Sequence, residues 1–149
     1  MRLTLFTDYC LRVLLYLAFK KGETVTIAEL ADFYKISRNH LVKVVHNLGI
    51  QGFIATTRGK NGGMKLARSA EEIVIGDVVR KMEVDFDFLE CFSEATDHCV
   101  ITNSCVLKSV MKGVRDDLLR TLDQYTIADA VKKPTKEISE FKSIPVIQE

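Results

Sequence analysis

Two short helical patterns that lie almost end to end constrain the fold of this 149-residue chain more than any other feature. Apolar residues recur at helical spacing after Thr26, which has Glu29 three residues on in the form of a capping box, and this pattern ends near Lys35. Ser37 can cap a second helix at once, and its apolar positions continue to about Gly52. Two helices joined by so short a turn predict a helix-turn-helix unit.

A glycine-rich hairpin is expected directly after this unit. Residues 53–57 are rich in β-forming side chains, residues 58–63 have the composition of a turn with an Asn-Gly dipeptide, and residues 64–67 can pair back as a second strand. A helical pattern resumes over residues 73–82. A hairpin after a helix-turn-helix is a wing, so we expect a winged helix-turn-helix domain over residues 1–82.

An amphipathic helix is expected before this unit. Apolar residues between Leu11 and Phe19 recur at helical spacing, Thr7 can cap the helix, and Gly22 ends the pattern. The apolar run contains Arg12 and is much too short to span a bilayer. We therefore expect neither a signal peptide nor a transmembrane helix, and a cytoplasmic location.

Basic residues are concentrated where the motif lies. The chain has 21 Lys+Arg and 20 Asp+Glu, but residues 1–80 carry a charge of +5 and residues 81–149 carry −4. No acidic residue occurs between Asp32 and Glu71, whereas seven basic ones do: Lys35, Arg38, Lys43, Arg58, Lys60, Lys65 and Arg68. Because Lys and Arg release counterions when they neutralise phosphates, this window predicts double-stranded DNA as a partner.

The second helix and the hairpin supply the candidate DNA contacts. The first turn of a recognition helix reads base edges, where Arg suits guanine and Asn suits adenine. Glycines at a wing tip allow close approach to a phosphate or a narrow minor groove, although a flexible, solvated hairpin is the alternative. The candidate DNA-binding residues are Ser37, Arg38, Asn39, His40 and Lys43 in the helix, and Arg58, Lys60, Asn61, Gly62 and Gly63 in the wing.

A long amphipathic pattern follows, from Ser104 to Tyr125. Its apolar stripe packs either on its own winged domain or on a second copy, and we favour a homodimer. We divide the rest of the chain into a cysteine-containing loop (83–103), a dimerisation helix region (104–131) and a tail (132–149). The predicted fold class is mostly α with a small β-hairpin, a winged helix-turn-helix domain plus a long C-terminal dimerisation helix.

Three of the four cysteines form a candidate metal site. Cys91, Cys99 and Cys105 have the spacing C-x7-C-x5-C, and their thiolates suit an iron–sulfur cluster or zinc. In a reducing compartment such cysteines bind metal or sense redox change more often than they form disulfides. The alternative is three packed or exposed thiols.

Three cysteines leave a four-ligand site one ligand short. His98 would complete a zinc site, Cys10 would make an all-thiolate site, and a carboxylate such as Asp8 would be a harder, weaker ligand. The spacing does not choose among them. Cys10 lies on the apolar first helix, where a buried core thiol is the simpler interpretation.

Several short motifs together resemble a known family over about residues 1–131. They are Leu3-Thr4, Thr7-Asp8-Tyr9, Leu11-Arg12, Ser37-Arg-Asn-His40, Arg58-Gly-Lys-Asn-Gly-Gly63, Ile75-Gly-Asp-Val-Val79, Cys91, Cys99-Val-Ile-Thr102, Cys105, Leu107-Lys108, Asp123, Tyr125-Thr126 and Ala128-Asp129. On these residues the chain resembles the nitric-oxide-sensing repressors of the Rrf-type family of bacterial winged-helix iron–sulfur regulators.

The resemblance implies a homodimer that binds a palindromic operator. It implies an iron–sulfur cluster, [2Fe-2S] or [4Fe-4S], held by Cys91, Cys99 and Cys105 together with Asp8 of the other subunit. Nitric oxide would be the effector, and its reaction would release promoters of nitric-oxide detoxification genes. Cys10 departs from the family pattern, in which a small residue is more common, and it is the alternative fourth ligand. Arg12 is expected to be a structural ion-pair partner. Its alternative role is to modify the properties of the cluster without being one of its ligands.

Three other functions compete with this one. An iron–sulfur-biogenesis-type regulator typically has a different cysteine spacing and a histidine ligand. A zinc or thiol redox-responsive winged-helix regulator would be colourless. A small enzyme or electron carrier is disfavoured because the chain has no glycine-rich phosphate loop, no nucleophile with a base, and no C-x-x-C. We therefore expect no enzymatic activity.

Overall fold

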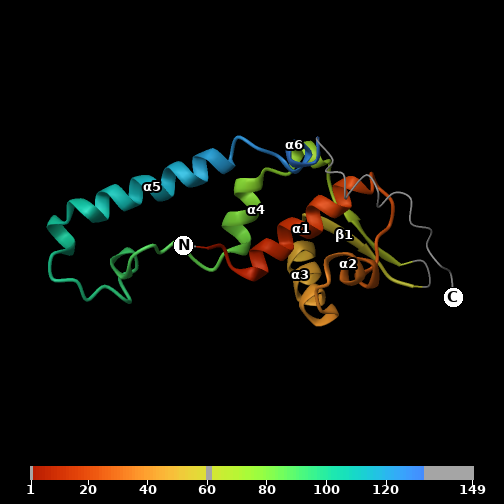
Figure 1. Ribbon diagram of the computed structural model, residues 1–149, viewed down its shortest axis with the longest axis horizontal. Coiled ribbons are helices and arrows are strands. Elements are labelled where there is room, and N and C mark those ends of the chain that lie inside the picture. The colour runs from red at the N-terminus through yellow and green to blue at the C-terminus, as the bar shows by residue number, and fades with distance from the viewer. Residues whose placement is uncertain (1, 60–61, 133–149) are drawn as a thin grey trace.

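The computed structural model describes residues 2–59 and 62–132, and it is mostly helical with one two-stranded antiparallel sheet (Figure 1). This confirms the predicted fold class as mostly α with a small β-hairpin, whereas the dimerisation role of the long C-terminal helix stays a prediction. The helices and strands are α1 (Leu5–Phe19), α2 (Ile27–Tyr34), α3 (Arg38–Ile50), β1 (Ile54–Thr57), β2 (Gly63–Leu66), α4 (Ile75–Met82), α5 (Val106–Leu122) and α6 (Ile127–Val131). Short 3-10 turns lie at η1 (Ala70–Glu72), η2 (Glu90–Phe92) and η3 (Thr102–Ser104).

Helix α1 begins earlier than the sequence pattern predicts, because Thr4 and not Thr7 is its N-cap. The Thr4 hydroxyl accepts from the Thr7 N–H at 3.2 Å, and Thr7 itself is buried within the helix. Thr4 is held in turn by Glu83, whose carboxylate accepts from the Thr4 N–H at 3.1 and 3.2 Å. These partners are 79 positions apart, so the local pattern does not reveal the cap.

The helix-turn-helix forms as predicted, from α2 and α3. The Thr26 hydroxyl accepts from the backbone N–H of Glu29 at 3.2 Å, and Ser37 caps α3 in the same way. The Glu29 carboxylate accepts from the Tyr16 hydroxyl at 2.8 Å, which ties α2 to α1. Lys35, in the left-handed conformation with a φ of 55°, ends α2 and turns the chain into α3.

The wing is the predicted hairpin, with β1 and β2 in antiparallel register. Strand β2 also bridges back to the segment between α1 and α2, where the backbone of Met64 exchanges hydrogen bonds of 2.8 and 2.9 Å with Val25. A side chain at Gly63 would collide with the Val25 carbonyl. Glycine at this position therefore lets the wing pack closely on the domain.

The core lies among α1, α2, α3, α4 and the base of the wing. Its largest fully buried side chains are Leu14, Leu17, Leu30, Leu41, Leu48, Phe53, Ile73 and Ile127. Ile127 belongs to α6, which the sequence pattern did not predict within the expected region 104–131. Helix α6 returns to pack on α1 (Figure 1), and the Ile127 N–H donates to the Ile73 carbonyl at 2.9 Å.

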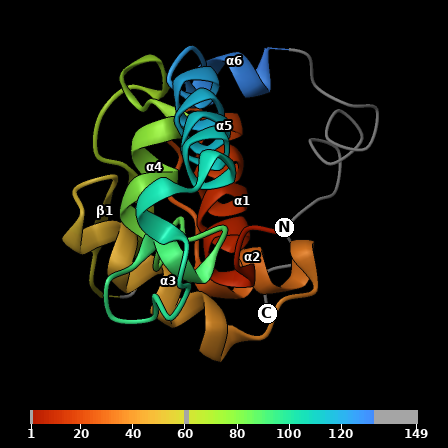
Figure 2. The same cartoon turned by 90° about the vertical axis from the view of Figure 1, so that its left-hand side faces the viewer.

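Helix α5 extends away from the winged domain, with the connection from α4 running beside it (Figures 1 and 2). We call this connection, residues 83–105, the cysteine segment. None of the 17 residues of α5 is buried. Within the described ranges, no helix has the combination of length and hydropathy that crossing a bilayer requires.

Candidate functional site

The candidate DNA-contacting residues of α3 lie on its exposed face. Leu41, Val44 and Leu48 are fully buried on the opposite face, so the helical period directs the first-turn side chains outward. All five candidate residues at the start of this helix are exposed: Ser37, Arg38, Asn39, His40 and Lys43. Together they form a polar, basic surface on α3.

The wing residues divide into two groups. Arg58 is exposed, and Lys60 and Asn61 lie outside the described residues. Gly62 and Gly63 are half-buried, and a side chain at Gly62 would collide with the carbonyl oxygens of Thr57 and Gly59. Both glycines therefore have a packing role in the turn, besides any close approach to DNA.

Asp8 lies on the first turns of α1 and forms an ion pair with Arg12 at 2.7 Å. Hydrogen bonding to the Asp8 carboxylate raises the pKa of the Arg12 guanidinium, which also lies 5.9 Å from the ring centres of Tyr9 and Tyr34. Arg12 therefore forms the expected ion pair, and its alternative role toward the cluster stays a prediction. The Asp8 side chain is 38% exposed, so its carboxylate is open to solvent.

The three candidate cysteine ligands all lie on the cysteine segment. Cys91 is buried in η2, Cys99 is half-buried, and Cys105 is half-buried at the position directly before α5. All are free thiols. Among the residues that the structure describes, no three His, Cys, Asp or Glu side chains come together as a metal-binding group.

These donors fit an iron–sulfur cluster in their chemistry, because three thiolates are the soft ligands that iron–sulfur centres use. One chain carries the thiols on a single segment, but Asp8 is on α1 and the four donors do not converge. A closed site therefore requires the segment to fold around the metal and a fourth ligand to be supplied.

Two other candidate ligands differ in their surroundings. Cys10 is fully buried in the core, where burial raises the pKa of its thiol to about 12. This agrees with its interpretation as a core thiol, because metal ligation needs the thiolate. His98 is exposed on the cysteine segment.

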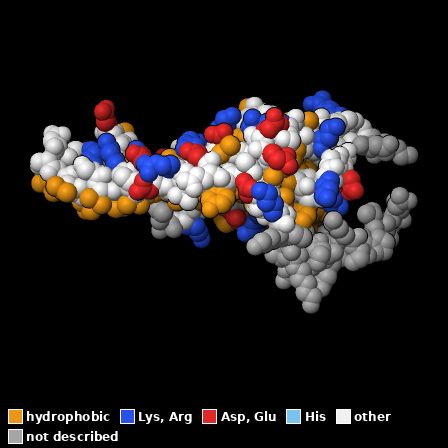
Figure 3. Space-filling model, turned by 90° about the horizontal axis from the view of Figure 1, so that it is seen from above, with side chains coloured by type: hydrophobic (Ala, Val, Ile, Leu, Met, Phe, Trp, Pro, Cys, Tyr) orange, Lys and Arg blue, Asp and Glu red, His pale blue; other side chains and the backbone are white. Residues whose placement is uncertain are grey.

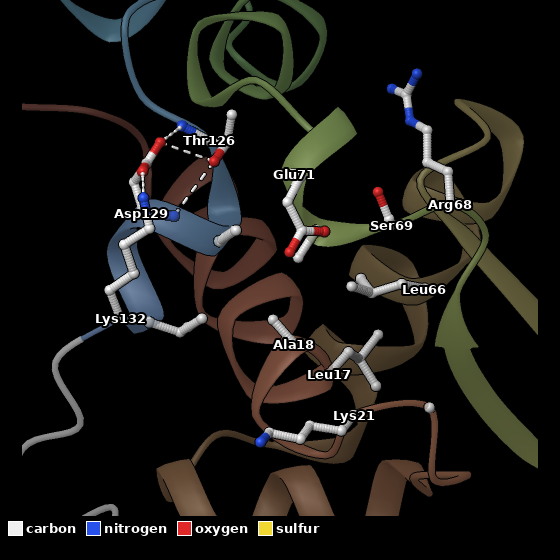
Figure 4. A pocket seen from close by; sticks show the side chains of 14 residues that line it. Leu17, Ala18, Lys21, Leu66, Arg68, Ser69, Glu71, Thr126, Asp129 and Lys132 are labelled. Atoms are coloured by element: carbon white, nitrogen blue, oxygen red, sulfur yellow. Dashed lines mark hydrogen bonds and ion pairs between the residues drawn. The ribbon is translucent and has the colours of Figure 1, made fainter.

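A pocket of about 740 Å³ opens on another part of the domain, between the end of α1, the connection from β2 to η1, and α6 (Figure 4). Leu17, Ala18 and Leu66 give it apolar walls, and Lys21 and Arg68 add charge. None of the predicted DNA or metal residues lines it. The sequence pattern did not indicate this pocket, because α6 forms one of its walls and was not predicted.

Helix α5 carries a row of exposed apolar side chains. The exposed fraction is 75% for Val106, 58% for Leu107, 54% for Val110 and 46% for Val114. Figure 3 shows hydrophobic side chains gathered along one edge of this extended end of the molecule. Apolar surface of this extent marks an interaction site more often than it marks free surface.

Comparison with known proteins gives the family. The sequence profile of Rrf2, described as an iron-dependent transcriptional regulator, matches residues 3–133. The chain belongs to the Rrf2 family. It is 46% identical over 132 residues to the HTH-type transcriptional regulator NsrR of Bacillus licheniformis, with 88% of this chain and 92% of that protein covered. NsrR of Bacillus subtilis (strain 168) is 47% identical over 133 residues, with coverage of 89% and 91%.

The fold is also found among solved structures. The oxidized form of CymR from Staphylococcus aureus superposes with a TM-score of 0.71 at 25% sequence identity, and the match covers 91% of this chain and 100% of that one. The expected resemblance is therefore confirmed, and this Rrf2 protein is a transcriptional regulator of the NsrR type. Its relatives are regulators and not enzymes, in agreement with the expectation from sequence.

Proposed function

We propose that this regulator is a repressor that senses nitric oxide through an iron–sulfur cluster and then releases promoters of nitric-oxide detoxification genes, in the cytoplasm. The observation that carries the proposal is the presence of three free thiols on one segment leading into α5, in a chain 46–47% identical to NsrR proteins.

The exposed face of α3 and the wing would bind the operator. Arg38 and Asn39 are suited to base edges, whereas Lys43 and Arg58 are suited to phosphates. The proposed contact set is Ser37, Arg38, Asn39, His40, Lys43, Arg58, Lys60, Asn61, Gly62 and Gly63. The exposure of its described helix residues and the absence of acidic residues from 33 to 70 support this assignment.

The cluster would be held by Cys91, Cys99 and Cys105, with Asp8 of a second subunit as the fourth ligand. When bound, the cluster supplies an iron centre that nitric oxide can attack. The exposed carboxylate of Asp8 and the complete burial of Cys10 favour Asp8 as the ligand. A carboxylate is also a harder ligand than a thiolate and binds such an iron centre more weakly, so it would be released more readily.

A second copy of the chain would cover the exposed stripe on α5. A symmetric homodimer presents two α3 helices, which matches a palindromic operator. Ligands from both subunits would couple the state of the site to the spacing of the two recognition helices. The exposed valines and leucine of α5 support this arrangement.

The test is an anaerobic visible absorption spectrum of the purified full chain, with iron and sulfide assays, during titration with nitric oxide and measurement of operator binding. We expect a coloured protein whose absorption and operator affinity fall together. The amounts of iron and sulfide per chain distinguish [2Fe-2S] from [4Fe-4S]. A protein that stays colourless after anaerobic reconstitution, yet binds DNA, would contradict cluster sensing and support a zinc or thiol regulator instead.

A further inference from the structure

Asp97 organises the part of the cysteine segment that carries two of the three thiols. Its Oδ1 atom accepts a hydrogen bond from the Cys99 N–H at 3.0 Å and another from the Thr102 hydroxyl at 2.9 Å. Its Oδ2 atom lies 3.6 Å from Nζ of Lys108, on the first turn of α5. One carboxylate therefore joins the residues on both sides of Cys99 to the helix that follows.

Backbone hydrogen bonds continue this turn as far as Ser104, the residue before Cys105. The Thr102 N–H donates to the Cys99 carbonyl at 3.2 Å, and the Ser104 N–H donates to the Ile101 carbonyl at 3.0 Å. The next residue, Cys105, is the N-cap position of α5. Residues 97–104 thus form a local unit that needs no metal for its internal hydrogen bonds, and Cys105 follows it directly.

The side chains of Asp97 and Lys108 are both largely shielded from water. The side chain of Asp97 is 17% exposed and that of Lys108 is 21% exposed, whereas the other ion pairs on α5 each include a partner that is at least half exposed. Limited exposure to water strengthens hydrogen bonds and ion pairs. The Asp97 contacts therefore restrain the turn more than a typical surface pair would.

Cys91 belongs to a separate turn. There the Thr96 hydroxyl donates to the Glu90 carbonyl at 2.8 Å, and the Arg115 guanidinium lies 5.5 Å from the ring centre of Phe92. In the described part of the chain, the hydrogen bonds and ion pair of Asp97 join it to Cys99, Thr102 and Lys108, and not to this turn. The cysteine segment is therefore built from two locally ordered turns, of which the second contains Cys99 and is followed directly by Cys105.

We propose that Asp97 is a positioning residue that holds Cys99 and Cys105 in a fixed relation at the start of α5 before metal binds; this rests on the iron–sulfur function proposed above. Only Cys91 and the fourth ligand would then have to move into place when the cluster binds. Residues that orient metal ligands through hydrogen bonds typically change metal affinity by about 10–100-fold when they are replaced.

The test compares Asp97→Ala, Asp97→Asn and Asp85→Ala in the full chain. Asp85 is a matched control, because it makes the same type of side-chain contact, accepting from the Asp87 N–H at 3.0 Å in the same segment, but far from Cys99 in sequence. Each protein is reconstituted anaerobically, and the rate of iron loss to a chelator is measured. Amide hydrogen exchange at Cys99 and Thr102 is measured in the metal-free proteins.

We expect Asp97→Ala to lose iron about tenfold faster than wild type and to lose amide protection at Cys99, with an unchanged thermal midpoint. The thermal midpoint of unfolding should not change, because the partners of Asp97 lie outside the buried core. Asp97→Asn keeps an acceptor oxygen and should recover most of the iron retention. Asp85→Ala should match wild type.

Failure of the positioning role can be distinguished from failure of the proposed function. If wild type and Asp97→Ala retain iron equally, or if Asp97→Asn is no better than Asp97→Ala, the positioning role is overturned while the proposed function stands. If wild type itself takes up no cluster, the proposed function is contradicted, and the inference with it.

Discussion

Arg80 of α4 and Asp123, the residue directly after α5, form a two-pronged ion pair with Nη1 to Oδ1 and Nη2 to Oδ2 distances of 2.5 and 2.7 Å. Gly76 lies beneath this pair, where a side chain would collide with the Asp123 carboxylate. The adjacent backbone adds a 2.9 Å hydrogen bond from the Ile75 N–H to the Tyr125 carbonyl. Because α4 packs on α1, this joint attaches the end of α5 to the winged domain.

The Arg80–Asp123 pair predicts a pH-dependent contribution to stability. The hydrogen bond from Arg80 holds the pKa of Asp123 below its ordinary value. A carboxyl group whose pKa is lower in the folded than in the unfolded chain stabilises the fold above the unfolded pKa, and this stabilisation is lost as pH falls through the folded pKa. Asp123→Asn should therefore be less stable than wild type at pH 7, and the difference should narrow below about pH 4.

Urea unfolding across this pH range measures the effect. Asp77→Asn is the control, since Asp77 is 3.8 Å from the same guanidinium and its side chain is more exposed than that of Asp123. Equal stability losses in the two variants, or a constant gap between Asp123→Asn and wild type at every pH, would contradict the assigned role of this ion pair.

The recognition surface predicts two different kinds of DNA-binding loss. Lys43→Ala should weaken binding to all sequences and reduce the slope of log affinity against log salt by about 1, because a phosphate contact is removed. Arg38→Ala should cost about 1–3 kcal/mol on the operator and reduce its preference over other DNA, because a base contact is removed.

Fluorescence anisotropy at several salt concentrations, on operator and unrelated duplexes, distinguishes these outcomes. His46→Ala serves as the control, because His46 is exposed on α3 but lies outside the predicted contact set. A recognition role for α3 is refuted if Lys43→Ala and Arg38→Ala both bind as His46→Ala does.

The sequence predicted most of the fold because the decisive signals are local. Apolar spacing marked the buried face of α3, and the Asn-Gly turn marked the wing. The cap at Thr4 was missed because its anchor, Glu83, is remote in sequence. Helix α6 was missed because its five residues are too few for a helical period, although the Thr126–Asp129 capping box marked its start.

The candidate metal site was less predictable than the fold. Thiol spacing identifies donors, but it does not show that Cys99 lies in one hydrogen-bonded turn, with Cys105 directly after it, while Cys91 occupies another turn. Cys99 and Thr102 contact Asp97 from its own turn, whereas Lys108 contacts it from the first turn of α5. Such relations depend on how the segment folds against the helix.

The α5 stripe predicts that a charge at its centre separates the subunits. Val110→Lys places an ammonium group where the side chain is 54% exposed in one chain and would be buried in the proposed homodimer. We expect a dimeric wild type and a monomeric variant by light scattering coupled to size exclusion. Ser109→Lys, at the neighbouring exposed polar position, should remain dimeric. A dimeric Val110→Lys protein would show that another surface joins the subunits.

Helix α6 is predicted to be part of the folding unit of the winged domain, although it follows α5 in the chain. Ile127 is fully buried, and its N–H donates to the Ile73 carbonyl beside α4. Ile127→Ala should lower the free energy of unfolding by about 2–5 kcal/mol, as expected for a large-to-small change in a packed core.

Val100→Ala is the control for this prediction. Because Val100 is 99% exposed, its replacement should change the free energy of unfolding by less than about 0.5 kcal/mol. Urea denaturation of the two variants gives both values. If both variants lose similarly little free energy of unfolding, α6 contacts α1 without stabilising the domain. The pocket that α6 helps to form would then lack a fixed shape.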